Sequence, residues 1–244
     1  MATQPGKTTL LELGDTSVDV VLKDIKNVHL SVHPPTGRVR IAAPHRMDVE
    51  AIRLFAISKL GWIKRQQRKL GEQQRETPRE YLERESHYVW GKRYLLSVDE
   101  ADHPPSVTLR HRRMHLTVRP HADEAKRAQV MEDWYREQVK DRSVPMISDW
   151  EPKVGVSVEK CFVQRMKTRW GSCNSKARTI RLNTDLAKKP LECLEYIVVH
   201  ELIHILEPTH NDRFKAMLRG LMPDWQDRRN LLNRLPVRHE DWGY

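Results

Sequence analysis

Two histidines four residues apart, with a glutamate between them, are the part of this chain best suited to chemistry. Residues 200–204 read His-Glu-Leu-Ile-His, which matches the pattern H-E-x-x-H. On a helix, residues i and i+4 lie on one face, so His200 and His204 can direct both imidazoles to one metal ion. Glu201 lies about 100° further round the helix. Its carboxylate is therefore free to hold a water molecule as a general base, and the pattern predicts metal-assisted hydrolysis.

The third metal ligand is predicted to be His210, six residues after His204. A catalytic zinc site needs three protein ligands and an open position for water. Pro208 disfavours helical backbone at Glu207, so the helix should end there and the chain can return with His210. The spacing equals that of the metzincin proteases, but those have glycine at the position of Glu207, and we do not assign the chain to them. Glu207 or a more distant carboxylate is the alternative third ligand.

The chemistry that follows is hydrolysis of a peptide bond, with Zn²⁺ as the expected cofactor. Zinc lowers the pKa of a bound water from 15.7 towards about 7. Glu201 would take the proton and pass it to the leaving amine. Two structural alternatives compete: an amphipathic helix whose histidines only line its polar face, and a metal that is structural. A functional alternative is a zinc hydrolase or amidase that acts on a non-peptide substrate.

The elements that must position this site lie in the last third of the chain. Apolar spacing predicts a helix over residues 191–206 that carries the H-E-x-x-H pattern. Strands are predicted at 156–163, 169–172 and 179–183, the last two joined as a hairpin. Two more helices are predicted at 211–221 and 223–232.

The rest of the chain alternates between strand-rich and helical stretches. Short β-branched runs predict strands at 8–13, 18–22, 28–32 and 38–42, followed by a helix at 48–75. Four further strands are expected at 87–90, 93–98, 107–110 and 115–119. A second long helix is expected at 123–150, ended by Pro152. We expect a strand-rich N-terminal region over residues 1–120 and a catalytic region over 121–244, which can form one compact unit.

The charge of the chain is positive and unevenly distributed. The 244 residues include 43 Lys and Arg against 33 Asp and Glu, a net charge of +10. Acid-free basic segments span residues 104–122 and 160–184, and Lys64, Arg65, Arg68 and Lys69 form a third cluster. A basic surface can hold a nucleic acid or an acidic partner, or can simply be solvated. The first reading gives a further alternative, a nucleic-acid-associated protease that acts on DNA-bound proteins.

Cysteine usage and hydropathy bear on the compartment. The chain has three cysteines and no CxxC pair, which favours a reducing, cytoplasmic location. No window approaches about 18 uninterrupted apolar residues, so no membrane span is predicted. The expected partner is a peptide or protein substrate, and the oligomeric state is open.

Several segments together resemble one protein family. These are Arg169-Trp170-Gly171-Ser172-Cys173, Ile180-Arg181-Leu182-Asn183, Pro190, residues 196–204, His210 with Phe214, and Pro223-Asp224-Trp225. They resemble the YgjP-like (SprT-like) zinc metallopeptidases. The resemblance implies an α+β, zincin-like fold with a small mixed sheet beside the active-site helix. It also implies zinc bound by His200, His204 and His210, with Glu201 as the catalytic glutamate.

The strand before the catalytic helix has two interpretations. In zincins an edge strand beside the active-site helix commonly pairs with an extended peptide, and Trp170 and Ser172 could then line a substrate groove. Alternatively, Trp170 is packed in the core and Ser172 caps a turn.

Overall fold

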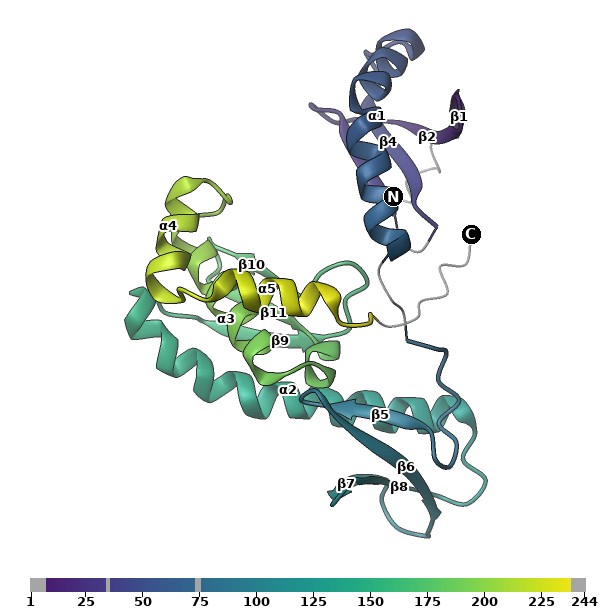
Figure 1. The fold of residues 1–244 in the computed structure, drawn as a ribbon, viewed down its shortest axis with the longest axis vertical. Coiled ribbons are helices and arrows are strands. Elements are labelled where there is room, and N and C mark those ends of the chain that lie inside the picture. The colour runs from purple at the N-terminus through teal and green to yellow at the C-terminus, as the bar shows by residue number, and fades with distance from the viewer. Residues whose placement is uncertain (1–7, 34–35, 73–75, 238–244) are drawn as a thin grey trace. The chain divides into compact units, whose positions relative to one another are not determined.

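The computed structural model describes residues 8–33, 36–72 and 76–237 (Figure 1), and the side chain of Lys69 lies outside this description. The chain divides into two compact units. The N-terminal unit comprises residues 1–75 with 240–244, and the C-terminal unit comprises residues 76–239. The fold is mixed α and β, with small sheets in both units.

The N-terminal unit is a four-stranded sheet with one helix. Its elements are β1 (Thr8–Leu13), β2 (Thr16–Lys23), β3 (His29–His33), β4 (Arg38–Pro44) and α1 (Val49–Glu72). The strand order is β1-β2-β4-β3, with β2 and β4 parallel and the other pairs antiparallel. Alternate strand residues such as Val18 and Ile41 pack against Ile52, Ala56 and Ile63 of α1. Together these side chains form a separate small core. The predicted strands and helix are confirmed, and the last three residues of the predicted helix lie outside the described residues.

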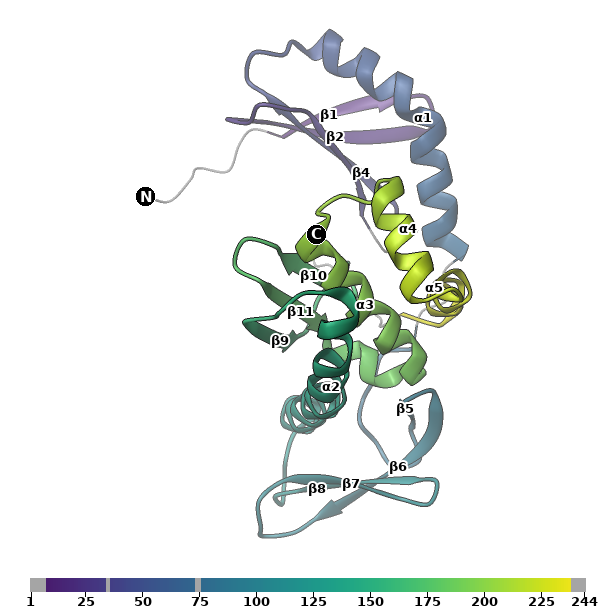
Figure 2. The ribbon, with the colours of Figure 1, turned by 90° about the vertical axis from the view of Figure 1, so that its left-hand side faces the viewer.

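The C-terminal unit begins with a second four-stranded sheet, packed on one long helix. It consists of β5 (Ser86–Val89), β6 (Lys92–Glu100), β7 (Ser106–Arg110) and β8 (Arg113–Val118), in the order β5-β6-β8-β7. Strands β6 and β8 are parallel. The helix α2 (Glu124–Val154) packs on one face of the sheet, as Figures 1 and 2 show. Buried residues Met114, Leu116 and Leu96 of the sheet share a core with Met131 and Val139 of α2.

Helix α2 is longer than the sequence pattern predicts. Asp123 caps its start by accepting a hydrogen bond from the backbone N–H of Lys126. The expected end at Pro152 is wrong, because the helix continues to Val154 with Pro152 inside it. The helix ends at Gly155, whose left-handed backbone (φ 77°) lets its N–H donate to the carbonyl of Glu151.

The remaining elements surround the histidine helix. A mixed three-stranded sheet contains β9 (Lys160–Gln164), β10 (Gly171–Asn174) and β11 (Thr179–Asn183), in the order β10-β11-β9. Strand β10 lies at its edge. Then follow a 3-10 turn, η1 (Thr184–Lys188), and helices α3 (Leu191–Leu206), α4 (Asp212–Leu221) and α5 (Trp225–Arg234). The predicted range of α3 is confirmed to the residue, whereas η1 was not predicted.

The division of the chain differs from the boundary expected at residue 120. The sheet β5–β8 shares one continuous hydrophobic core with α2, α3 and β11, through residues such as Val118, Tyr135, Leu182 and Val198. Residues 76–120 therefore belong to the same compact unit as the histidine helix. A shared core formed by residues distant in sequence leaves no local signal in the sequence by which its boundary could be predicted.

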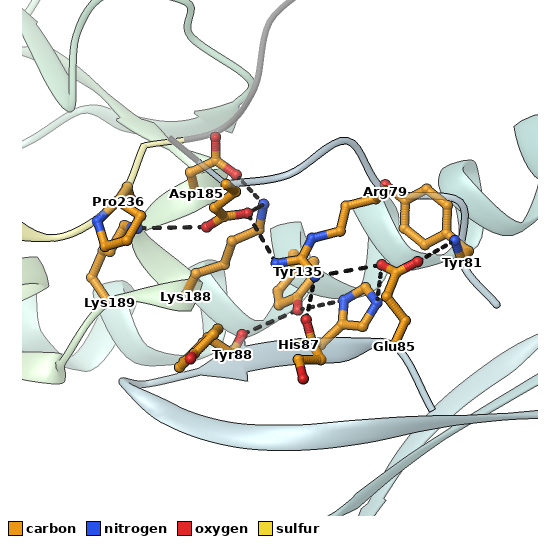
Figure 3. A network of polar contacts seen from close by, with 12 residues as sticks. Arg79, Tyr81, Glu85, His87, Tyr88, Tyr135, Asp185, Lys188, Lys189 and Pro236 are labelled. Carbon is orange, nitrogen blue, oxygen red and sulfur yellow. Dashed lines mark hydrogen bonds and ion pairs between the residues drawn. The ribbon is translucent and has the colours of Figure 1, made fainter. Parts of the chain in front are cut away.

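A buried polar network ties the start of the C-terminal unit to η1 and to its end (Figure 3). The carboxylate of Glu76 lies 3.5 Å from Lys188 Nζ and 3.7 Å from Lys189 Nζ. Lys188 also pairs with Asp185 at 2.8 Å, and Lys189 donates to the carbonyl of Pro236. These contacts hold the turn that leads into α3 in place.

Within the described residues, none of the helices is both long and apolar enough to cross a membrane.

Candidate metal centre

Three histidine side chains converge at the end of α3. The helix is anchored by a buried face that includes Leu194, Val198 and Leu202, which leaves His200 and His204 on its more open side. The helix ends at Leu206, Glu207 caps it in extended backbone before Pro208, and the chain then turns back with His210. The Nε2 atom of His210 lies 2.9 Å from that of His200 and 3.1 Å from that of His204.

This arrangement fits a metal ion. Three nitrogens at the corners of a tetrahedron, each about 2.0–2.1 Å from zinc, are separated from one another by ~3.3 Å. The observed separations are a few tenths of an ångström shorter than that. His204 Nδ1 lies 3.0 Å from the carbonyl oxygen of Glu207. Because a carbonyl only accepts, Nδ1 carries the proton and Nε2 keeps a free lone pair towards the other two histidines.

The ring of Phe214 supports all three imidazoles. Its centroid lies 4.9, 4.7 and 4.8 Å from those of His200, His204 and His210. Phe214 is held by the start of α4, where the side chain of Asn211 accepts a hydrogen bond from its backbone N–H. The apolar platform limits the orientations of the three rings, a role that sequence reasoning did not assign to it.

The environment favours the neutral forms of His200 and His210. Burial lowers the pKa of His200 to about 3, with further lowering by the charges of His204, His210 and Arg229. Burial, His204 and Arg229 lower the pKa of His210 as well. Neutral imidazoles are the form that binds metal ions. Arg229 belongs to α5, on the same side of that helix as Trp225 and Leu232, which are buried.

Glu201 is buried beside the histidines, with only 4% of its surface exposed. Its Oε2 atom has no hydrogen-bond partner among the described residues. Burial raises the pKa of Glu201 to about 8, and the charge of Arg169 opposes this effect. A buried carboxylate oxygen without a partner is unfavourable unless a ligand, a water or a cation completes it.

A glycine of the neighbouring strand makes room for this carboxylate. A Cβ atom added to Gly171 of β10 would lie 2.6 Å from Glu201 Oε1, 2.9 Å from its Cγ and 2.9 Å from Ile197 Cγ2. Only glycine permits such a close approach. This role of Gly171 could not be predicted from the sequence, because the contact joins residues thirty positions apart.

The remaining predicted residues lie around one cavity of about 550 Å³. Trp170 and Ser172 line it together with Glu201 and the three histidines. Trp170 also packs against the core of the unit, and Lys189 Nζ lies 5.8 Å from the centre of its ring. Strand β10 pairs with β11 on one side, so its other edge borders the cavity. Arg169, at the cavity wall, is a further cation that the sequence did not single out.

Comparison with known proteins gives structural and family matches. Among solved structures, the metallopeptidase zymogen abylysin of Pyrococcus abyssi is 22% identical, with a TM-score of 0.33, over 41% of this chain and 99% of that one. The zymogen jannalysin of Methanocaldococcus jannaschii is 24% identical, with a TM-score of 0.33, over 39% of this chain and 87% of that one. No curated protein matches.

The family comparison covers most of the chain. Residues 26–235 match the family described as YgjP-like, metallopeptidase domain. The matched range includes the three converging histidines, Glu201 and strand β10. The chain therefore belongs to the YgjP-like family of metallopeptidases.

Proposed function

We propose that this metallopeptidase is zinc-dependent, with His200, His204 and His210 as metal ligands and Glu201 as the general base. One observation carries the proposal. Three imidazoles, each with a ring nitrogen within 4.8 Å of those of the other two, lie beside a buried carboxylate oxygen that has no partner among the described residues. Three nitrogen ligands with one position left open are the donor set of catalytic zinc sites.

Glu201 moves the proton in this mechanism. When bound, Zn²⁺ would polarise the substrate carbonyl and make a nearby water more acidic. The positive charge would also favour the ionised form of Glu201, against the effect of its burial. Oε2 of Glu201 then accepts a proton from the attacking water and delivers it to the nitrogen of the leaving amine.

We infer from its electrostatic effect on two of the histidines that Arg229, an exposed residue of α5, stabilises the negative charge that develops on the substrate oxygen. Its charge already acts on His200 and His210, and the buried neighbours Trp225 and Leu232 fix the helix that carries it. A cation placed beforehand where charge develops lowers the barrier. An Arg229→Gln variant should therefore lose kcat with unchanged zinc content, and a loss of zinc would contradict this assignment.

The peptide substrate lies along the free edge of β10. A strand at the edge of a sheet presents unpaired backbone groups to an extended chain. Trp170 and Ser172 lie at this edge, on the cavity that contains the histidines. We therefore assign both to substrate binding. A reducing, cytoplasmic setting is consistent with the free thiols of Cys161, Cys173 and Cys193, whose pKa values burial raises to about 11.

Metal analysis tests the ligand set. Purified wild-type protein, dialysed against zinc, should retain about one zinc per chain. The His210→Ala variant should bind zinc at least tenfold more weakly. His121→Ala serves as a matched control, because this exposed histidine lies outside the site. Unchanged affinity in His210→Ala would shift the third ligand to Glu207 or another carboxylate, and preferential retention of another metal would overturn the assignment to zinc.

Peptide cleavage tests the base. Wild-type protein is incubated with an unfolded protein and with a peptide library, and Glu201→Gln should reduce cleavage by about 10²- to 10⁴-fold while zinc content is unchanged. Cleavage that persists in this variant would remove Glu201 from the mechanism. Hydrolysis of small amides without cleavage of any peptide would favour the non-peptide alternative.

A further inference from the structure

The sheet β5–β8 is electrically polarised along its strands. Strands β6 and β8 are parallel, so their starting residues lie at the same end of the sheet. The two-residue turns Trp90-Gly91 and His111-Arg112, which lead into these strands, meet at that end. Five exposed cations gather there: Lys92, Arg93, Arg110, Arg112 and Arg113. The other end of β6 carries the acidic residues Asp99 and Glu100.

These five cations, which we call the basic end, form no ion pair with any described residue. Elsewhere in the chain, cations such as Lys64 and Arg228 do have carboxylate partners. Arg110 and Arg113 are also direct cross-strand partners, an arrangement of like charges that destabilises a sheet. An anionic ligand would relieve this repulsion.

A cavity of about 630 Å³ lies at the basic end. Its lining contains no carboxylate and is formed by Lys92, Arg93, Tyr94, Leu95, His111 and Arg112. It is separate from the cavity of the histidines, with which it shares no lining residue. The lining therefore combines positive charge with ring and apolar surface.

The face of the sheet opposite α2 also combines positive charge with ring and apolar surface. Leu96 and Met114 point to the core, so the alternate residues Leu95 and Arg113, which are register partners, lie on the outer face. Tyr88 and Arg93 are cross-strand partners on that same face. Tyr88 is 41% exposed and Leu95 39% exposed, so both offer flat or apolar surface beside the guanidinium groups.

We propose that the basic end and the adjoining outer face of this sheet bind single-stranded nucleic acid. Guanidinium groups bind phosphate with paired hydrogen bonds, and four of the five cations are arginines. The exposed ring of Tyr88 provides a stacking surface for an unpaired base, as aromatic rings do in single-strand binding sites. An acidic peptide would use the charges but not this ring. The proposal does not depend on the proposed peptidase mechanism.

The basic end is held firmly on the unit that carries the metal centre. The backbone N–H of Trp90 donates to the carbonyl of Ala187 in η1 at 2.7 Å. A Cβ atom on Gly91 would lie 2.9 Å from Pro190 Cγ, at the start of α3. Nucleic acid bound at this surface is thus tied to the same compact unit as the histidines, rather than to a separate module.

Binding is measured on the full chain, with Glu201→Gln to suppress proteolysis, by fluorescence anisotropy of labelled oligonucleotides of about 12 nucleotides. Single-stranded DNA or RNA should bind, with affinity that falls steeply as salt increases. The triple variant Arg93→Gln, Arg110→Gln, Arg113→Gln should lose at least tenfold in affinity. Its salt slope should fall by about 2, because each lost phosphate contact contributes about 0.7. Tyr88→Ala should weaken binding about 5- to 100-fold.

A matched triple variant on α1, Lys59→Gln, Arg65→Gln and Arg68→Gln, removes the same charge from the N-terminal unit. It should bind like the unmodified chain, and an equal loss there would overturn the proposal. So would the absence of binding at low salt, or equally tight binding of a glutamate peptide of matched charge, which would indicate an acidic protein partner. The sheet triple should melt at the same or a higher temperature, since it removes the Arg110–Arg113 repulsion, and a lower melting temperature would contradict that reading.

Discussion

Two buried polar regions of the C-terminal unit are built in opposite ways. Around η1, Lys188 pairs with Asp185 (Figure 3). The carboxylate of Glu76 lies within 4 Å of both Lys188 and Lys189, so each of these buried charges has an opposite charge nearby. At the metal centre, Glu201 Oε2 and His200 Nδ1 are buried without hydrogen-bond partners among the described residues. Both regions lie within one compact unit.

The paired region contributes to stability, whereas the unpaired region is suited to binding a ligand. A buried charge with partners holds its elements together, and removing one partner leaves the other uncompensated. A buried carboxylate oxygen without a partner lowers stability and is retained where a ligand completes it. Lys188 and Lys189 directly precede the helix of the histidines, so the paired region holds in place the element that carries the unpaired one.

The largest expected effect comes from breaking the paired region. Glu76→Gln leaves Lys188 and Lys189 buried without their shared carboxylate, and the free energy of unfolding should fall by about 3–5 kcal/mol. Burial raises the pKa of Glu76, but the charges of Lys188, Lys189 and Arg79 outweigh this effect, so the carboxylate is ionised at neutral pH. Urea denaturation measures the change. Glu80 is an exposed neighbour, so Glu80→Gln should change the free energy of unfolding little. Equal losses of stability in both variants would contradict the role of Glu76 as the buried partner of the two lysines.

Zinc should stabilise the protein through the unpaired region. A ligand that binds only the folded state adds about 2.7 kcal/mol at a concentration one hundred times its Kd. Zinc added to metal-free protein should therefore raise the melting temperature of wild type by several degrees. His210→Ala, with zinc affinity at least tenfold lower, should show about half of this shift or less at the same zinc concentration. Glu76→Gln should show the shift in full from a lower starting temperature. A full shift in His210→Ala would mean that His210 is not a zinc ligand.

The next effect concerns the space around Glu201. Gly171→Ala places a methyl group against Oε1 of Glu201, and overpacking of this kind reduces stability by about 1–3 kcal/mol. Because the displaced carboxylate is the proposed base, kcat should fall while zinc affinity stays constant. Gly220→Ala in α4 is the control, since nothing lies within 4 Å of a Cβ there. That substitution should be neutral or slightly stabilising.

The sequence predicted the local elements better than the contacts between them. Residues 191–206 were predicted as a helix because apolar residues recur at helical spacing over its whole length. His210 could be proposed as a ligand because Pro208 ends the helix and restricts where the chain goes. The end of α2 was missed, because Pro152 near a helix terminus interrupts few hydrogen bonds and Gly155 supplies the actual stop.

Long-range proximity was out of reach from one sequence. Gly171 and Glu201 meet only because β10 packs beside α3, and Arg229 acts on the histidines only because α5 lies against that helix. Neither pair has a fixed sequence spacing. The core that β5–β8 share with α2 and α3 likewise joins residues far apart in sequence. For this reason the boundary between the two compact units lies near residue 75 and not at the predicted residue 120.

The smallest effect is the acid sensitivity of Glu85 and His87, whose Oε1 and Nε2 atoms lie 2.9 Å apart beside the paired region. Burial raises the pKa of Glu85, but the hydrogen bond and charge of His87, backbone N–H groups and Arg79 outweigh this and lower it to about 2. A carboxyl with a depressed folded-state pKa adds stability above its unfolded value, near 4.5, which is lost as the pH falls towards 2. Burial lowers the pKa of His87 too, so protonation of the unfolded chain below about 6.5 acts in the same direction.

Denaturation curves between pH 7 and pH 2 measure this effect. Glu85→Gln should flatten the decline of stability below pH 4.5, while the decline between pH 6.5 and pH 4.5 should persist because His87 is still buried. An exposed carboxylate such as Glu124 provides the control, and Glu124→Gln should leave the curve unchanged. If Glu85→Gln followed the wild-type curve throughout, the acid sensitivity would belong to other carboxylates. The paired region would then be held by Glu76, Lys188 and Lys189 alone.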